Sequence, residues 1–150
     1  MLKKRAESGF TLIETVMVVS IIFILITMFS WKINNWISYF RLKSDLRSLY
    51  SIFLTARQLA IMKQEPHGLI FEQNRFHLFS EFNGILKTKS LSSGIKFVQD
   101  IHFGNDNKMS FKPLGTAEGG NVTLMNNFNQ KYKITVYSHT GRVRFIKNEE

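Results

Sequence analysis

Residues 15–31 form an apolar stretch that contains no charged residue, no glycine and no proline. At a rise of about 1.5 Å per residue, it lies at the short end of what crosses a hydrocarbon core about 30 Å thick. Counting from Phe10 extends the run to a comfortable spanning length, interrupted only by Glu14. Because a segment in lipid must satisfy its own backbone hydrogen bonds, it is expected to be helical. The sequence therefore predicts a membrane-spanning helix over residues 10–31.

The residues around the start of this stretch differ from those of an ordinary membrane anchor. Residues 3–5 are basic, and the small residue Gly9 lies between this leader and the apolar run. A secretory signal instead has its cleavage site after the apolar run. Glu14 places a carboxylate about one helical turn inside the apolar segment, where an unpaired charge is unfavourable. It is also close enough to the start of the helix to reach the interface, where the helix dipole favours a carboxylate.

The segment Lys3–Glu14, KKRAESGFTLIE, resembles the amino-terminal signal of type IV pilins and pseudopilins. The resemblance implies cleavage after Gly9 by a prepilin peptidase, methylation of the new amino terminus at Phe10, and retention of the apolar segment as the start of a long helix. It also implies that this helix bundles with those of other pilins or pseudopilins in a filament core. In such a filament, the glutamate at the position of Glu14 pairs with the terminal amine of a neighbouring subunit.

An apolar stripe continues the helix beyond the membrane. Its members recur at spacings of three and four residues, and they are Leu42, Leu46, Leu49, Phe53, Ala56 and Ala60. The charged residues that fall off this stripe are Arg41, Lys43, Asp45, Arg47 and Arg57. Pro66, followed by Gly68, is expected to end the helix. The chain is therefore divided into a leader (1–9), a long helix (10–65, of which 10–31 span the membrane and 32–65 are amphipathic) and a β-sheet domain (66–150).

From Gly68 onward the apolar pattern changes from helical spacing to alternation. Turn signals such as Asn83-Gly84 separate the alternating segments. Six or seven short strands are predicted, with apolar positions that include Leu69, Phe71, Phe76, Leu78, Ile95, Phe97, Ile101, Phe103, Met109, Phe111, Val122 and Leu124. One helix followed by several short strands predicts an α+β fold with antiparallel sheet. The resemblance implies the type IV pilin-like fold, in which the long helix packs on that sheet.

Three segments near the carboxyl end resemble the signature of the GspH/FimT group of minor pseudopilins. They are residues 111–117, 119–124 and 140–143. Competence pseudopilins of the ComGD type are similar in length, leader and ending. A major pilin is less consistent with this sequence, because those subunits often carry a terminal loop that is closed by cysteines or bound to metal, and this chain has no cysteine.

The sequence shows no pattern expected of an enzyme. It contains no His-Glu-x-x-His, no Gly-x-Ser-x-Gly and no Walker loop. The histidines lie far apart, three of them at predicted turns or strand surfaces, and they are His67, His77, His102 and His139. Residues 105–107 have the spacing of a calcium loop, but no glutamate follows at the required distance, so an ordinary loop is expected. We expect no catalytic residue, no metal site and no cofactor.

Residues 131–147 are basic and contain no acidic residue. The first part of this segment alternates as a strand whose apolar residues face the core. The same alternation places Lys131, Lys133 and Tyr137 on the outward face.

A turn leads into a second strand, predicted over residues 142–147. Alternation there is expected to place Val143 and Phe145 inward and Arg142 and Arg144 outward. Arginines beside an exposed tyrosine can bind phosphates and stack on a base. Alternatively, the positive charge forms a solvated strand face that guards against edge pairing. The Gly-Arg-x-Arg pattern also resembles the DNA-binding ending of some pilins in the FimT group. The two arginines, with the three outward residues of the preceding strand, are therefore candidate DNA-binding residues.

Together, the residues and the resemblance favour a minor pseudopilin of a competence pilus, involved in DNA binding and uptake. The same type of subunit in a type II secretion pseudopilus is one alternative, and a membrane-tethered ligand binder that never polymerises is another. The positive-inside rule keeps the leader in the cytoplasm, so the chain is expected to cross the membrane once and to reach the cell surface after assembly. The expected partners are other pilins, prepilin peptidase, membrane lipid before assembly, and DNA.

Overall fold

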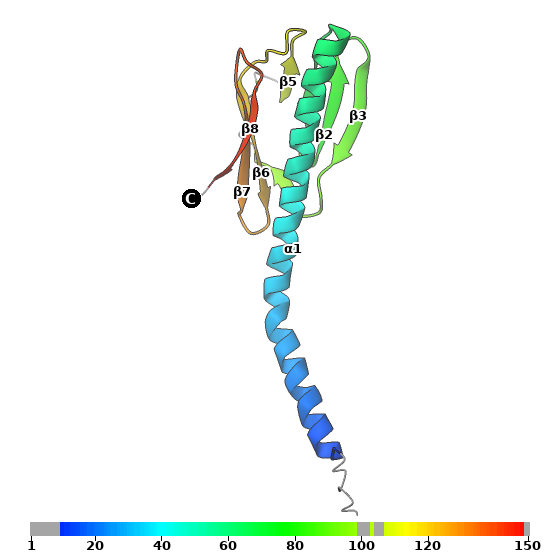
Figure 1. Ribbon diagram of the computed structural model, residues 1–150, viewed down its shortest axis with the longest axis vertical. Coiled ribbons are helices and arrows are strands. Elements are labelled where there is room, and N and C mark those ends of the chain that lie inside the picture. The colour runs from blue at the N-terminus through cyan, green and yellow to red at the C-terminus, as the bar shows by residue number, and fades with distance from the viewer. Residues whose placement is uncertain (1–9, 99–102, 104–106, 149–150) are drawn as a thin grey trace, which may run out of the picture. The chain divides into compact units, whose positions relative to one another are not determined.

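The structure is a computed structural model that describes residues 10–98, 103 and 107–148. Its contacts divide the chain into two compact units, Met1–Trp36 and Ile37–Glu150. One helix, α1 (Leu12–Lys63), contributes residues to both units, and all the described strands belong to the second (Figure 1).

Residues at both ends of α1 explain why the helix starts and stops there. The Thr11 carbonyl accepts the backbone N–H groups of Glu14 and Thr15 at 3.1 and 3.2 Å. The Thr11 hydroxyl also accepts the Glu14 N–H, at 3.4 Å, as an N-cap threonine does. At the other end, Gln64 has a φ of 54°, the left-handed conformation that commonly follows a helix. The helix thus ends just before Pro66, as the sequence predicts.

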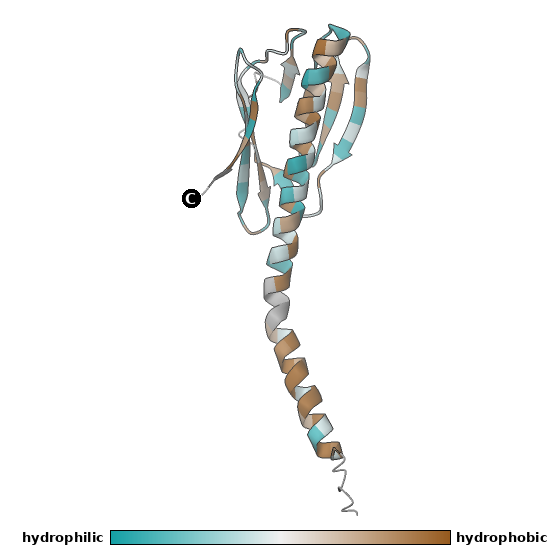
Figure 2. Cartoon of the chain, in the orientation of Figure 1, coloured by the Kyte–Doolittle hydropathy of each residue, from teal (hydrophilic) through white to brown (hydrophobic). Residues whose placement is uncertain are grey.

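The large apolar side chains of α1 between Leu12 and Met28 are exposed, and Figure 2 shows this stretch as largely hydrophobic. Ile13 and Phe23, for example, are 72% and 65% exposed. By length and hydropathy, no single described helix qualifies as a membrane span, whereas Leu12–Met28 and Ile33–Lys63 qualify when taken as a bent pair. The span over residues 10–31 therefore stays a prediction.

Two antiparallel sheets make up the β-structure of the second unit. The described strands are β1 (His67–Phe71), β2 (Arg75–Ser80), β3 (Gly84–Ser90), β4 (Ile95–Phe97), β5 (Lys108–Phe111), β6 (Gly120–Asn126), β7 (Lys131–Val136) and β8 (Val143–Asn148). The first sheet has the order β3-β2-β1-β5 and the second has the order β4-β6-β7-β8. The edge strands are therefore β3 and β5 in one sheet and β4 and β8 in the other.

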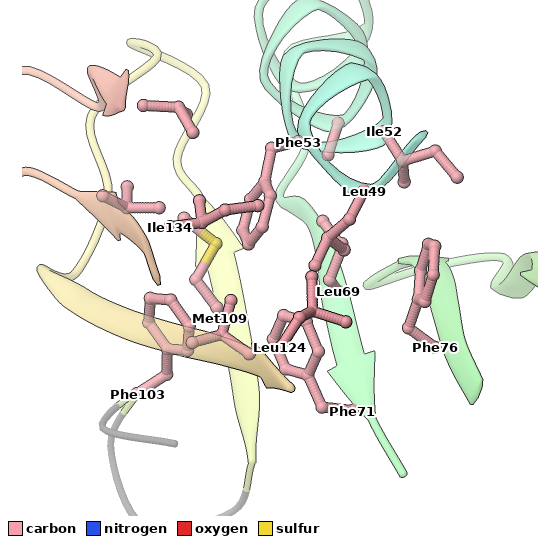
Figure 3. Packing of buried hydrophobic residues seen from close by; sticks show 14 of the residues in the cluster. Leu49, Ile52, Phe53, Leu69, Phe71, Phe76, Phe103, Met109, Leu124 and Ile134 are labelled. Carbon is pink, nitrogen blue, oxygen red and sulfur yellow. The ribbon is translucent and has the colours of Figure 1, made fainter. Parts of the chain in front are cut away.

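The core of the second unit lies between these sheets and one face of α1 (Figure 3). All the predicted stripe residues are buried, at 0–2% exposure: Leu42, Leu46, Leu49, Phe53, Ala56 and Ala60. The Phe53 ring lies 6.0 Å from that of Phe71 and 6.2 Å from that of Phe103, between ring centroids. The Phe71 ring in turn contacts the Phe97 ring edge-on at 5.4 Å. This aromatic cluster joins the helix to both sheets, because Phe71 belongs to β1 and Phe97 to β4.

The structure differs from the sequence prediction at β3, at Phe103 and at Asp45. The strand β3 was not predicted, because all its residues are exposed and it therefore lacks an apolar pattern. Phe103 is buried at 1% exposure but belongs to no strand, and Ile101 lies outside the described residues. Asp45 was expected to lie off the buried face, yet it is only 6% exposed. Its two carboxylate oxygens accept the Ser92 N–H at 2.7 Å and the Ser92 hydroxyl at 3.1 Å.

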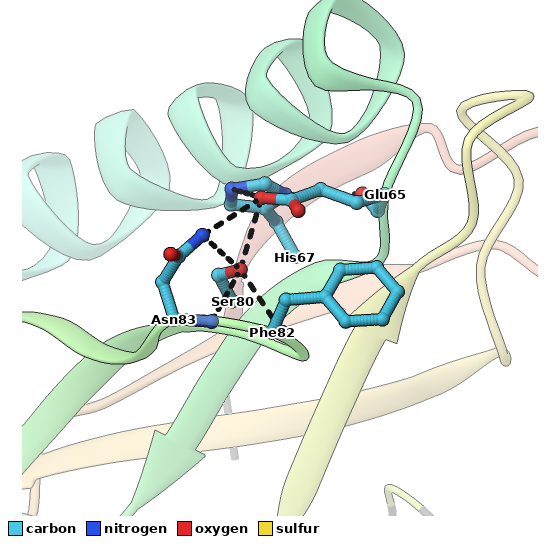
Figure 4. Close-up of polar contacts among 5 residues, drawn as sticks. All are labelled: Glu65, His67, Ser80, Phe82 and Asn83. Atoms are coloured by element: carbon cyan, nitrogen blue, oxygen red, sulfur yellow. Dashed lines mark hydrogen bonds and ion pairs between the residues drawn. The ribbon is translucent and has the colours of Figure 1, made fainter.

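His67, one of the four histidines of which three were predicted at turns or strand surfaces, is completely buried. Its Nδ1 lies 3.0 Å from the Glu65 carbonyl oxygen, and its Nε2 lies 3.3 Å from Glu65 Oε1 without hydrogen-bond geometry. The Ser80 hydroxyl donates to the same carboxylate at 3.0 Å and accepts the backbone N–H groups of Phe82 and Asn83 (Figure 4). This polar cluster joins the end of α1 to β1 and to the turn between β2 and β3.

His77 is also buried, at 6% exposure. Its Nδ1 lies 2.8 Å from the Thr88 hydroxyl and its Nε2 lies 3.0 Å from Glu72 Oε1. The hydrogen bond from Arg75, followed by the one from His77, holds the pKa of the exposed Glu72 carboxyl below its ordinary value. Because the folded-state pKa is lowered, the contribution of Glu72 to stability is present above its unfolded-state pKa and is lost as the pH falls. Because the Glu72 side chain is exposed to solvent, that contribution is small.

Gly68 occupies a position in β1 that no side chain can share. A Cβ atom there would lie 1.9 Å from the Met109 carbonyl oxygen of β5 and 2.8 Å from Cε1 of Phe79. The first of these atoms belongs to the backbone of a paired strand, so it cannot move aside without disturbing the sheet.

We predict that Gly68→Ala destabilises the second unit by roughly 1–3 kcal/mol or more, the usual range for overpacking. Gly84→Ala is the matched control, because its φ is +70° but no atom lies within 4 Å of the added Cβ. That change should cost only the strain of a left-handed alanine, about 1 kcal/mol. Urea unfolding of the full chain in detergent, followed by near-ultraviolet circular dichroism, measures both. Equal midpoints for the two variants would contradict the steric argument.

Candidate functional site

The amino-terminal motif begins α1 and combines a local and a predicted intermolecular role. Thr11 is the N-cap and Glu14 is the third residue of the helix, the spacing of a capping box. Both Phe10 and Glu14 are exposed. Gly9, the predicted cleavage position, lies outside the described residues. The capping role of Thr11 was not predicted, although the Thr-x-x-Glu spacing that indicates it is visible in the sequence.

The candidate DNA-binding residues lie on β7, β8 and the turn between them. The register pairs Thr135 with Arg144, and the Tyr137 N–H donates to the Arg142 carbonyl at 2.9 Å. Because directly paired residues share one face of a sheet, both arginines lie on the outward face with Lys131, Lys133 and Tyr137. Tyr137, Arg142 and Arg144 are exposed, whereas the two lysines are half-buried.

Phe145 does not follow the prediction that it faces the core, because it is 51% exposed. It pairs with Ile134, which is completely buried, so it does lie on the core side of the sheet. However, β8 is the edge strand, and the helix covers only part of its inner face. There the Phe145 ring contacts the Tyr50 ring of α1 edge-on, with centroids 5.5 Å apart.

An open groove of about 470 Å³ lies between α1 and β8. Its lining residues are Tyr50, Leu54, Arg57, Arg142, Val143, Arg144, Phe145 and Ile146. The lining contains three arginines and no carboxylate, together with two aromatic rings. Of the predicted site residues, the structure thus brings Arg142 and Arg144 to the groove, whereas Lys131, Lys133 and Tyr137 are not among its lining.

Arg57 positions the turn from which Arg142 projects. Its Nε donates to the Gly115 carbonyl at 3.1 Å and its Nη2 to the Thr140 carbonyl at 3.2 Å. Gly141, with a φ of +60°, approaches so closely that a Cβ atom there would lie 2.1 Å from the Gly115 carbonyl oxygen. The guanidinium group therefore ties α1 to two loops. The sequence pattern showed Arg57 only as a charge beside the apolar stripe.

The chemistry of the groove suits an anionic ligand with flat apolar groups. Guanidinium groups pair with phosphate oxygens in fixed geometry, and the Tyr50 and Phe145 rings offer apolar surface beside them. Within the described residues, no three histidine, aspartate or glutamate side chains are placed to hold a metal ion.

Comparison with known proteins finds a match for the amino-terminal motif and another for the fold. Residues 4–30 match the family described as the prokaryotic N-terminal methylation motif. Two solved structures of the minor pseudopilin EpsH from the type II secretion system of Vibrio cholerae have similar folds, with TM-scores of 0.59 and 0.57. They are 15% and 13% identical to this chain and cover 71% and 73% of it, with 97% and 96% of their own lengths matched. No curated protein matches the sequence.

The likeness to EpsH confirms the predicted α+β architecture, with a long amino-terminal helix followed by antiparallel sheets. The methylation motif lies at the head of that helix and continues into it. This chain therefore combines a prokaryotic N-terminal methylation motif with a fold similar to that of a minor pseudopilin.

Proposed function

We propose that this chain is a minor pseudopilin, inserted in the cell membrane and then assembled with other pilins into a short pilus. The observation that carries the proposal is the methylation motif over residues 4–30, which leads directly into α1 on a pseudopilin fold. The activity proposed is assembly rather than catalysis. A prepilin peptidase removes the leader after Gly9, and Phe10 becomes the methylated amino terminus.

The exposed apolar surface of the first unit supplies the means of assembly. Its large apolar side chains between Leu12 and Met28 are exposed, and this surface would contact lipid first and neighbouring helices afterwards. Glu14 carries the carboxylate that pairs with a neighbour's terminal amine. The pair forms in an apolar surrounding, where an unpaired carboxylate is unfavourable and a paired one is retained.

Within this function, we propose a competence pilus whose subunit binds DNA through the groove between α1 and β8. The three arginines and the absence of a carboxylate in its lining support this choice. The alternative is a minor pseudopilin of a type II secretion system, which the likeness to EpsH supports. The third candidate, a tethered binder that never polymerises, would not require the carboxylate of Glu14 for its function.

We predict that Gly9→Val blocks processing, because a small residue is needed at the leader junction. The variant should remain in the membrane fraction as a precursor heavier than the wild-type protein by the mass of residues 1–9. Mass spectrometry of both proteins from membranes makes the comparison. A wild-type protein that keeps residues 1–9 would refute the pilin interpretation.

We predict that Glu14→Val inserts into the membrane at least as well as the wild type, because it removes a charge from the apolar segment. Its incorporation into the pilus should nevertheless fall, which immunoblots of sheared pilus fractions measure. Thr11→Ala is the matched control, since it removes the cap hydroxyl but keeps the carboxylate. If both variants lose incorporation equally, the role of Glu14 is helix capping; if Glu14→Val assembles normally, the intermolecular pair is wrong.

We predict that the full chain in detergent binds DNA weakly and without sequence preference, because phosphate contacts carry no sequence information. Replacing Arg142 and Arg144 with glutamine should weaken binding and reduce the salt slope by roughly one unit per lost contact. The control replaces Lys87 and Lys89 of the exposed edge strand β3 with glutamine. It removes two positive charges, as the arginine variant does, but from a strand away from the groove. Titrations at several salt concentrations test the site, and equal effects of the two double variants would show that only net charge matters.

A further inference from the structure

The second unit has a basic end, at the place where α1 enters it. Residues 37–48 of the helix contain Arg41, Lys43 and Arg47. The only acidic residue among them, Asp45, is buried with both oxygens bonded to Ser92. Arg41 and Arg47 are exposed. These roughly three turns of helix therefore carry three cations and one carboxylate, and the exposed charges among Arg41, Asp45 and Arg47 are the two arginines.

Two further elements bring cations to the same end. Lys89 of β3 donates to the hydroxyl of Ser48 on α1, which places the end of β3 beside this part of the helix. Lys131 begins β7, and the hydroxyl of the next residue, Tyr132, lies 3.5 Å from that of Tyr39. Figure 1 shows the same arrangement, with the turn between β6 and β7 reaching the end of the unit where α1 enters.

Exposed apolar side chains accompany these cations. Ile37 and Phe40 on α1 are 43% and 62% exposed, and Phe128 at the tip of the β6–β7 hairpin is 40% exposed. The opposite end, where α1 terminates, carries charges of both signs: Glu65 follows Lys63 of the last helical turn, and Glu81 Oε2 lies 3.7 Å from Lys108 Nζ. The two ends thus differ in charge: the cations at the end where α1 enters have Ile37, Phe40 and Phe128 exposed beside them.

We propose that this basic end is a docking surface for the anionic headgroups of the membrane in which the subunit waits before assembly. The proposal rests on the membrane insertion proposed above. Residue 37 follows the expected span over residues 10–31 by only a few residues, so chain length alone keeps this end within reach of the headgroups. Lysine and arginine attract anionic lipid, while aromatic rings prefer the interface itself.

Headgroup docking would make the position of the unassembled subunit depend on the lipid charge and on the salt concentration. Each exposed cation near an anionic surface strengthens the association by about fivefold, and the effect is screened beyond a Debye length of about 8 Å at physiological salt. The domain is therefore held against anionic membranes and released from them by salt. Extraction into the pilus must break these headgroup contacts.

A fluorescent probe at the hairpin tip tests the proposal in the full chain. Because the sequence has no cysteine, Asn127→Cys gives a single site for an environment-sensitive dye. Leu114→Cys, which is 86% exposed in the loop after β5, gives the comparison site. Each labelled chain is reconstituted in phosphatidylcholine vesicles with and without phosphatidylglycerol. We expect the dye at position 127 to shift to shorter wavelength only with phosphatidylglycerol, and the dye at position 114 to remain unchanged.

Charge variants then identify the cause. Arg41→Gln with Arg47→Gln should abolish the phosphatidylglycerol-dependent shift at position 127. Lys63→Gln with Lys112→Gln removes the same charge from exposed positions elsewhere and should leave the shift intact. Equal loss in both double variants would overturn the proposal, as would a dye at position 127 that does not distinguish the two vesicles.

Resistance to extraction by alkaline carbonate distinguishes a failure of membrane insertion from a failure of headgroup docking. A wild-type chain that carbonate extracts refutes membrane insertion, and the docking proposal with it. A chain that resists extraction but shows no lipid-dependent shift refutes docking alone. A shift that persists without phosphatidylglycerol, and that increases with protein density in the vesicle, would assign the surface to contact with another copy instead.

Discussion

One buried face of α1 holds the second unit together, because both sheets close their core against it. Within the described residues, the two sheets share no strand pairing, so side-chain packing has to join them. Phe53 contacts Phe71 and Phe103, and truncating such a buried aromatic residue typically costs about 3–5 kcal/mol. On the flanks of the same face, Asp45 is bonded to Ser92 and Arg57 to the loops that carry Gly115 and Thr140. The helix thereby fixes the loops as well as the strands.

The sequence predicts most of this arrangement, because burial leaves a periodic pattern. Every residue of the stripe from Leu42 to Ala60 is buried, and α1 ends at Lys63, just before Pro66, as expected. The strand β3 could not be found in this way, since a strand exposed on both faces has no apolar alternation. Nor does periodicity reveal that His67 is buried beside Glu65, because a polar residue in a core depends on partners far apart in the sequence.

The candidate site was predicted only in part, because a periodic pattern shows which face of a strand a residue lies on but not which other elements lie beside it. Alternation along β7 and β8 correctly places Arg142 and Arg144 outward. Alternation cannot show that Arg57 and Tyr50, which lie far earlier in the chain on α1, are beside the two arginines of β8 and its turn. Phe145 was assigned to the core because alternation says which face a residue is on, but not how far the covering helix extends over that face. The capping role of Thr11, in contrast, was readable from its spacing to Glu14.

Positive charge on an edge strand is not by itself a sign of ligand binding, because it can also prevent the strand from pairing with another chain. In this protein β3 is an example of such a strand. It carries Lys87 and Lys89 on an exposed edge, next to a register shift between Leu78 and Phe79, which are features that prevent pairing with another chain. Protection of an edge needs only such charge and irregularity. The edge at β8 has more than that, because a third arginine from α1 and the Tyr50 and Phe145 rings line the same groove. Edge protection does not account for Arg57 and Tyr50, which belong to α1, and for this reason the groove at β8, and not β3, is the candidate site for an anionic ligand.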